Sequence, residues 1–295
     1  MDNTMNIDEL KTAAKQGDVL AQVQLGVHYT EAEDYEEAVR WYRLAAEQRE
    51  ASDLRACAQN SLGHAYNEGL GVPKDAKDAV KWWRMAAEQG LAGAQLNLGN
   101  AYNNGNGVPE DAKEAVKWFR MAAEQGEAFA QHNLGNAYDK GNGVGKNMVE
   151  AVKWWRMAAE QGLAASQFNL ANVYEQGDGV AENKEEALKW YRKLAEQDGS
   201  DYQARAQEKV RVILSRKDGC CYIATAVYGS YDAPEVLCLR QFRDETLSAF
   251  LFGRLFIRVY YFLSPPIARR LKNMRRTNAV VRRMLDVFIQ KCLSI

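Results

Sequence analysis

Cys221 is the residue best placed to act as a nucleophile, because it stands at an expected helix start, where a thiolate is favoured. A cysteine nucleophile also needs a nearby base, and no histidine follows His132 in the sequence. We therefore interpret Cys221 as a buried structural cysteine and expect no catalytic residue. A Cys-dependent enzyme is the alternative that this residue leaves open.

A repeat of 36 residues organises the chain up to about residue 199. Leucines and tryptophans recur at this spacing, at Leu62, Leu98, Leu134 and Leu170 and at Trp82, Trp118, Trp154 and Trp190. A fixed period of roughly 20 to 50 residues is typical of stacked arrays, in which one unit cannot bury its apolar face alone. Neighbouring units must therefore bury it.

Each unit is expected to form two helices. In the third unit the apolar stripe of the first helix consists of Ala94, Leu98, Ala101 and Tyr102. Gly99 lies beside this stripe and would let the next helix approach closely, and two glycines before Pro109 would end the helix.

The second helix of the third unit is expected to begin at Asp111, with Glu114 three residues later, in the pattern of a capping box. The same spacing recurs at Asp34/Glu37, Asp75/Asp78, Asn147/Glu150 and Asn183/Glu186. The side chains expected on its buried side are Ala115, Trp118, Met121 and Ala122.

These residues follow the pattern A-Q-x-x-L-G-x-x-Y-x-x-G-x-G-V-x-x-D/N-x-x-x-A-x-x-W-x-x-x-A-A-E-Q-G. It resembles the Sel1-like repeat, a relative of the tetratricopeptide repeat, over roughly residues 5–199. The resemblance implies an all-α fold, a right-handed α/α solenoid (superhelix) whose first helices line its concave face. It also implies a protein-binding scaffold.

Amide side chains recur on the first helices at positions that point away from the core. With Leu98 at the centre of the buried stripe, 100° per residue turns Asn100 and Asn103 outward. The predicted partner-binding residues on the concave face are His64, Asn67, Asn100, Asn103, Asn136, Asp139, Asn172 and Glu175. Such a column could hydrogen-bond the backbone of an extended peptide, or it could simply solvate an exposed face.

Asn97, Asn133 and Asn169 lie nearer the core edge and are interpreted as structural. The histidines His28, His64 and His132 occupy three different positions in their units, so we expect neither a metal site nor a proton relay. The glycine loops follow a helix and lack the lysine of a phosphate-binding loop, so they are interpreted as turns. We expect no cofactor, no metal and no small-molecule substrate.

The predicted domain order is an N-terminal cap at 1–18, five repeats, and a capping helix at 200–218. The repeats are placed at about 19–50, 56–90, 91–126, 127–162 and 163–199. The first repeat has a shortened loop, Thr30–Glu33, and such an atypical end unit suits a cap whose outer face meets water.

Charge is distributed unevenly along the chain of 295 residues. Residues 1–200 contain 21 Lys and Arg against 31 Asp and Glu, a net of −10, and residues 201–295 contain 17 against 8, a net of +9. Two parts with different partners are indicated. The N-terminus lacks the features of a secretory signal and the five cysteines have irregular spacing, so we expect a cytoplasmic protein.

The second part begins with Cys221-Tyr-Ile-Ala-Thr-Ala-Val-Tyr-Gly-Ser230 and continues through Ser264-Pro-Pro266. It is similar to the bacterial CFI-box C-terminal domain, although Tyr222 stands where that family has Phe. We place this small helical domain at residues 219–271. The resemblance names this domain without assigning an activity to it.

Residues 246–295 carry 10 Lys and Arg against one acidic residue, and 272–295 are predicted to form a basic amphipathic tail helix. Its predicted basic surface consists of Arg269, Arg270, Arg275, Arg276, Arg282 and Arg283. This surface suits a protein partner, including the acidic repeats of the same chain, or an anionic membrane surface; nucleic acid is the least favoured. We expect a non-catalytic scaffold that binds a peptide or protein, with a peripheral-membrane adaptor at the inner membrane surface as the alternative.

Overall fold

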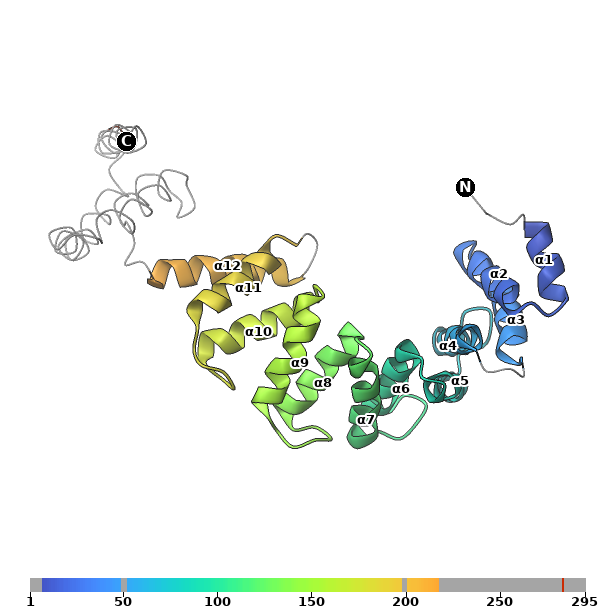
Figure 1. Cartoon of the computed structure of the whole chain (residues 1–295), viewed down its shortest axis with the longest axis horizontal. Helices are drawn as coiled ribbons and strands as arrows, with labels where there is room; N and C mark the ends of the chain where they lie inside the picture. Colours follow the sequence, from blue (N-terminus) through green and yellow to red (C-terminus); the bar gives the residue numbers. More distant parts are fainter. Residues whose placement is uncertain (1–6, 49–51, 198–200, 218–282, 284–295) are drawn as a thin grey trace. The chain divides into compact units, whose positions relative to one another are not determined.

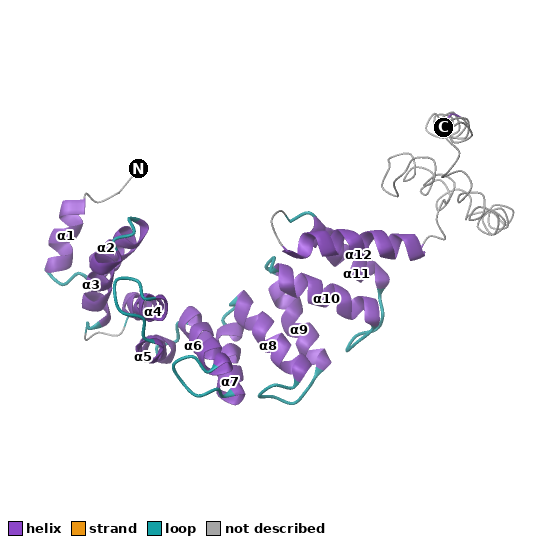
Figure 2. Ribbon diagram, turned by 180° about the vertical axis from the view of Figure 1, so that it is seen from behind, coloured by secondary structure: helices purple, strands orange, loops and turns teal. Residues whose placement is uncertain are grey.

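The computed structural model describes residues 7–48, 52–197, 201–217 and 283. Within these residues the chain forms α-helices and no strand, which confirms the all-α prediction (Figures 1 and 2). The chain divides into two compact units, residues 1–190 and 191–295. The helices are α1 (Ile7–Lys15), α2 (Val19–Glu31), α3 (Tyr35–Ala46), α4 (Asp53–Glu68), α5 (Ala76–Glu88), α6 (Ala92–Asn104), α7 (Ala112–Glu124), α8 (Ala128–Lys140), α9 (Met148–Glu160), α10 (Ala164–Gln176), α11 (Lys184–Ala195) and α12 (Asp201–Lys217).

The compact part formed by residues 1–190 is a series of helix pairs, one pair per repeat: α2 with α3, α4 with α5, α6 with α7 and α8 with α9. The second helix of each pair also contacts the first helix of the next pair. One leucine at the centre of each first helix is completely buried between these neighbours. These leucines are Leu25, Leu62, Leu98, Leu134 and Leu170. The short helix α1 packs on α2. In the second unit, Ala206 and Ile213 of α12 are buried.

The second helices begin at side-chain caps, as predicted. The Asp111 carboxylate accepts hydrogen bonds from the backbone N–H groups of Lys113 and Glu114, at 2.9 and 3.1 Å. A capping box also requires the Glu114 side chain to accept a hydrogen bond from the Asp111 N–H, and this part of the prediction is wrong. The Asp111 N–H donates to the carbonyl of Tyr102 at 2.9 Å. Glu114 instead pairs with Lys117 at 3.3 Å. Equivalent caps are formed by Asp34, Asp75, Asn147 and Asn183.

The Asp111 cap gives a first testable prediction. Asp111→Ala should lower the free energy of unfolding by about 1 kcal/mol, because it leaves two helix-end N–H groups without their acceptor. Asp111→Asn keeps an acceptor oxygen and should lose much less. Urea denaturation followed by circular dichroism measures both, and equal losses in the two variants would contradict the cap assignment.

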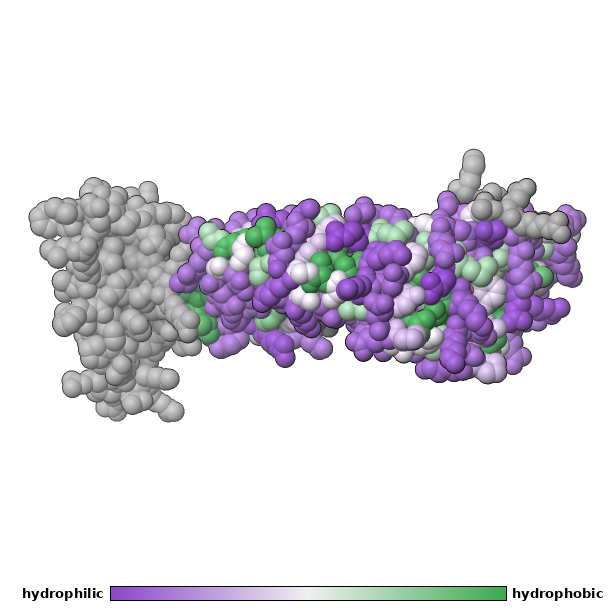
Figure 3. Space-filling model, turned by 90° about the horizontal axis from the view of Figure 1, so that it is seen from below, coloured by the Kyte–Doolittle hydropathy of each residue, from purple (hydrophilic) through white to green (hydrophobic). Residues whose placement is uncertain are grey.

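Met121 is exposed, so its placement on the buried side was wrong. The buried face of α7 takes in Val116, Phe119 and Ala123 together with Ala115, Trp118 and Ala122, and its centre is thereby turned away from Met121. Met85 and Met157, one unit away on either side, are exposed as well. Seen from below, the described part shows hydrophobic patches divided by polar side chains (Figure 3).

Glutamines buried in the first helices connect successive repeats. Gln22, Gln59, Gln95, Gln131 and Gln167 are at most 3% exposed. Gln95 Nε2 donates to the Ala87 carbonyl at 3.2 Å, and Gln95 Oε1 accepts from Gln125 Nε2 at 2.8 Å. Gln59, Gln95 and Gln131 each bond in this way to the second helix before it and to a glutamine at the end of the second helix after it. Among the described residues, Gln167 makes only the first of these bonds, to the Ala159 carbonyl.

Candidate functional site

The first helices of successive repeats stand side by side and form one face of the compact part at residues 1–190. Asn133 Nδ2 of α8 donates to Asn100 Oδ1 of α6 at 3.0 Å, and Asn169 Nδ2 of α10 donates to Asn136 Oδ1 of α8 at 3.4 Å. Asn97 Nδ2 of α6 likewise reaches Asn60 Oδ1 of α4 at 3.0 Å. The structural role predicted for Asn97, Asn133 and Asn169 is thereby confirmed. In Figure 1, α4 and α6 lie on the inner side of the curve that this unit follows.

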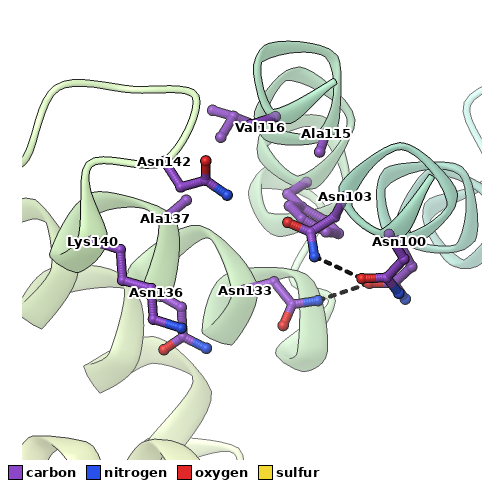
Figure 4. A pocket seen from close by; sticks show the side chains of 12 residues that line it. Asn100, Asn103, Ala115, Val116, Asn133, Asn136, Ala137, Lys140 and Asn142 are labelled. Carbon is purple, nitrogen blue, oxygen red and sulfur yellow. Dashed lines mark hydrogen bonds between the residues drawn. The ribbon is translucent and has the colours of Figure 1, made fainter. Parts of the chain in front are cut away.

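A cavity of about 360 Å³ opens on this face between α6, α7 and α8 (Figure 4). Its walls carry amide groups and one ammonium group, and its floor is apolar. The lining residues are Asn100, Asn103, Asn104, Ala112, Ala115, Val116, Phe119, Asn133, Asn136, Ala137, Lys140 and Asn142. No carboxylate lines it. The cavity therefore offers hydrogen-bond donors and acceptors above an apolar floor.

Glycines make room for the aromatic side chains of this face. A Cβ on Gly99 would lie 2.6 Å from Phe119 Cδ1, and a Cβ on Gly135 would lie 2.5 Å from Trp155 Cδ1. Such distances are far below van der Waals contact. The close approach predicted at Gly99 is confirmed, and it brings the ring of the second helix to the cavity between first helices.

Asn136 is held by several hydrogen bonds. Its Oδ1 accepts from Trp155 Nε1 at 3.0 Å and from Asn169, and its Nδ2 contacts His132 Nε2 at 3.0 Å. His132 Nε2 must then be the acceptor, which places the proton on Nδ1, directed to Ser166 Oγ at 2.8 Å. In this tautomer the imidazole cannot remove a proton from Ser166, which is also completely buried. The arrangement resembles a catalytic triad only in composition.

Burial lowers the pKa of His132, and the nearby positive charge of Lys140 lowers it further. Protonation would place an N–H on Nε2 against the Asn136 N–H, and the amide cannot flip without opposing the Trp155 N–H. Stability from this network is therefore full above the ordinary histidine pKa of 6.5 and is lost as the pH falls through the lower pKa of the folded chain.

The folded chain should therefore lose stability as the pH falls. The melting temperature of the intact chain should fall between pH 7.5 and pH 5, and His132→Gln should reduce that fall, because glutamine does not titrate. Differential scanning calorimetry over the pH series measures it. An unchanged pH dependence in the variant would show that His132 does not contribute.

The structure brings together five of the eight predicted partner-binding residues. Asn100, Asn103 and Asn136 line the cavity between α6 and α8, and Asp139 and Asn172 line a second cavity one unit further along. The other three, His64, Asn67 and Glu175, line neither cavity.

His64 contacts the ring of Trp83 edge-on, at 5.8 Å between ring centroids, and lies 3.1 Å from Asn97 Nδ2. Burial lowers the pKa of His64. Asn67 Oδ1 accepts from Asn106 Nδ2 at 2.9 Å. Both residues are therefore engaged within the protein, which weakens the case for including them in a binding surface.

Sequence reasoning missed Phe119, Trp155, Lys140 and Asn142 as lining residues. A signal for the two aromatic residues was present in the glycine beside each buried leucine. Lys140 carried no signal of its own, because the periodic pattern treats the end of the first helix as solvent-exposed.

The remaining predicted features fall largely outside the described residues. Arg283 is exposed, whereas the other five predicted arginines, Cys221 and the CFI-box-like stretch lie beyond the part that the structure describes. Cys57 is a half-buried free thiol, and burial raises its pKa. Among the described residues no group of His, Cys, Asp and Glu could hold a metal ion. None of the described helices is both long and apolar enough to cross a membrane.

Helix pairs that stack through equivalent contacts in successive units define a helical-repeat solenoid. The family model of the Sel1 repeat matches residues 19–49, 58–91, 92–127, 128–163 and 164–199, and the chain therefore belongs to the Sel1 repeat family. Repeats of this kind generally serve as protein-interaction scaffolds.

Several solved structures resemble the chain, and two of them are at least 30% identical to it. One is a protective antigen of uropathogenic Escherichia coli strains with an SLR fold, 32% identical, with a TM-score of 0.65 over 95% of this chain and 65% of that chain. This chain thus spans less than two thirds of that relative. The other is a Sel1 repeat protein from Oxalobacter formigenes, 33% identical, with a TM-score of 0.57 over 66% of this chain and 77% of that chain. No curated protein sequence matches the chain.

Proposed function

We propose that the chain is a non-catalytic, cytoplasmic scaffold that holds an extended segment of a partner protein along the face formed by α6, α8 and α10. The observation that carries this proposal is the pair of cavities at successive unit boundaries, each with polar walls and an aromatic side chain beneath. Cavities that recur with the repeat suit a linear ligand, which also presents similar groups at regular intervals.

The hydrogen bonds of the amides indicate which groups of the ligand they would recognise. Asn100 Oδ1 accepts from Asn133, whereas Asn100 Nδ2 has no acceptor among the described residues. Asn136 Oδ1 is taken by Trp155 and Asn169. Asn136 Nδ2 also donates, to His132 Nε2, so Asn100 Nδ2 is the donor that this network leaves for a ligand. The carbonyl groups of an extended peptide backbone are the matching acceptors.

The second part of the chain has a separate place in this proposal. We propose that the basic tail expected at 272–295 binds a further protein surface. The rationale is compositional, since a net charge of +9 over residues 201–295 suits acidic surfaces.

The proposal is tested by peptide selection on the intact chain. A displayed library of random dodecapeptides is selected, and an enriched peptide is titrated by fluorescence anisotropy. Asn100→Ala combined with Asn103→Ala should weaken binding by about tenfold, because two hydrogen bonds of modest net strength are removed. We leave Asn136 unchanged, since its replacement would strand the buried Trp155 N–H.

Gln24→Ala is the matched control, because Gln24 is an exposed amide of α2 that lines neither cavity. It should bind the selected peptide as the unaltered chain does. Equal affinity of the double variant and the unaltered chain would overturn the proposed groove, provided that circular dichroism shows both to be folded.

A further inference from the structure

The two cavities are the same site repeated. The second, of about 190 Å³, is lined by Asp139, Met148, Trp155, Asn169, Asn172, Val173, Gln176 and Asp178. Each of these residues lies 36 positions after a residue that lines the first cavity. Phe119 corresponds to Trp155, and Asn133 to Asn169, so an aromatic ring and a structural amide recur in both.

The charges of the two cavities differ in sign. The first contains Lys140 and no carboxylate, whereas the second contains Asp139 and Asp178 and no basic group. The counterparts of these aspartates in the first cavity are Asn103 and Asn142, which are neutral. Two similar cavities on neighbouring units thus offer one positive charge and two negative charges.

These charges are available to a ligand. Lys140 and Asp178 are exposed and Asp139 is half-buried, and within the described ranges none of the three forms an ion pair. Asp139 and Lys140 are consecutive residues of α8, and their side chains serve opposite sides of that helix, one for each cavity. The change of sign therefore occurs across a single helix.

Building on the proposed function, we infer that the occupant is an extended peptide with an acidic side chain in the amide and Lys140 cavity and a basic side chain in the Asp139 and Asp178 cavity. In this direction of the peptide chain each cavity holds a side chain of opposite charge. In the reversed direction each cavity would hold a side chain of like charge, so the charges fix the direction and register of the peptide. The aromatic floor of each cavity accommodates the apolar stem of a long charged side chain.

The spacing of the two charges in the peptide follows from helix packing. Neighbouring packed helices lie about 8–10 Å apart, and Asn133 and Asn100 bridge α8 and α6 directly. A polyproline II segment advances about 9 Å in three residues and returns to the same side, since its rise is about 3.1 Å per residue. The acidic and basic side chains should therefore be about three residues apart.

The test uses peptides enriched from the dodecapeptide library on the intact chain. They should carry an acidic and a basic residue about three positions apart, in one constant order. Lys140→Glu should weaken binding of such a peptide by about five- to tenfold, because an exposed attraction becomes a repulsion. Exchanging the acidic residue of the peptide for lysine should restore binding to Lys140→Glu. Lys153→Glu, with the same change in charge on exposed α9 surface outside both cavities, should have little effect.

The outcomes separate this inference from the function on which it rests. Enriched peptides without such a charge pair, or equal binding to Lys140→Glu, would overturn the charge inference. If those peptides still lost affinity for the Asn100→Ala and Asn103→Ala variant, the proposed function would stand. If no peptide were enriched, or if the asparagine variant bound equally well, both would fall.

Discussion

Gly107→Ala is expected to lower the free energy of unfolding by about 3 kcal/mol or more, because it combines backbone strain with overpacking. Gly107 has a φ of +76°, and a Cβ there would lie 2.1 Å from the carbonyl oxygen of Ala76 at the start of α5. This contact joins the loop of one unit to the second helix of the preceding unit. The backbone cannot rotate away as a flexible side chain could, so the stacking of two units should be disturbed.

Gly105→Ala is the matched control for this variant. Gly105 also has a left-handed φ, +65°, but a Cβ there would lie no closer than 3.5 Å to any atom of Glu110, which is an ordinary contact. Gly105→Ala should lower the free energy of unfolding by about 1 kcal/mol, because only the strain of the left-handed backbone conformation is added. Urea denaturation of both variants gives the difference. Equal losses would show that the approach of Gly107 to the preceding unit does not contribute to stability.

Gln131→Leu is expected to lower the free energy of unfolding by about 2 kcal/mol, because two hydrogen bonds that join α8 to its neighbours are lost. Gln131 is 1% exposed. Its Nε2 donates to the Ala123 carbonyl at 3.1 Å, and its Oε1 accepts from Gln161 Nε2 at 2.8 Å. Leucine fills a similar volume and satisfies neither group. The stability that the buried glutamine provides should therefore depend on its amide group and not on its size.

Gln161→Leu removes the other partner of the same bond and provides the comparison. In this variant Gln131 Oε1 loses its donor, but Gln131 Nε2 keeps its bond to the Ala123 carbonyl. The expected loss is about 1 kcal/mol, because one of the two hydrogen bonds is removed and the other is kept. Chemical denaturation of both variants tests the asymmetry. A larger loss for Gln161→Leu would contradict the assignment of Gln131 as the buried member that holds the units together.

The repeat and its helices could be predicted because leucine, glycine and cap residues recur at a fixed period. Leu98 and Asp111 each occupy a position whose burial or hydrogen bonding follows from local spacing alone. Gln95 could not be predicted in the same way, because hydrophobic periodicity counts a glutamine as polar and places it outside the core. Its burial depends on partners in two other helices, and those distances are not contained in one period.

The candidate site was predictable only in part. The outward direction of Asn100 and Asn103 follows from 100° per residue, and both line the cavity. The sequence did not reveal that the oxygens of Asn100 and Asn136 are already used, since those bonds cross between units. The opposite charges of Lys140 and Asp139 were not recognised either. Lys140 and Asp139 line different cavities because successive side chains of α8 point to different sides of the helix.

The most direct test of the central claim is a nitrogen-15 spectrum of the tryptophan indoles of the intact chain during titration with a selected peptide. Trp155 lines the second cavity and its Nε1 donates to Asn136, whereas Trp118 and Trp154 line neither cavity and their Nε1 groups make no hydrogen bond within the part of the chain that the structure describes. Trp155→Phe identifies the first signal. The account predicts that the Trp155 signal shifts on binding while those of Trp118 and Trp154 stay in place. A peptide that binds and leaves the Trp155 signal unmoved would contradict it.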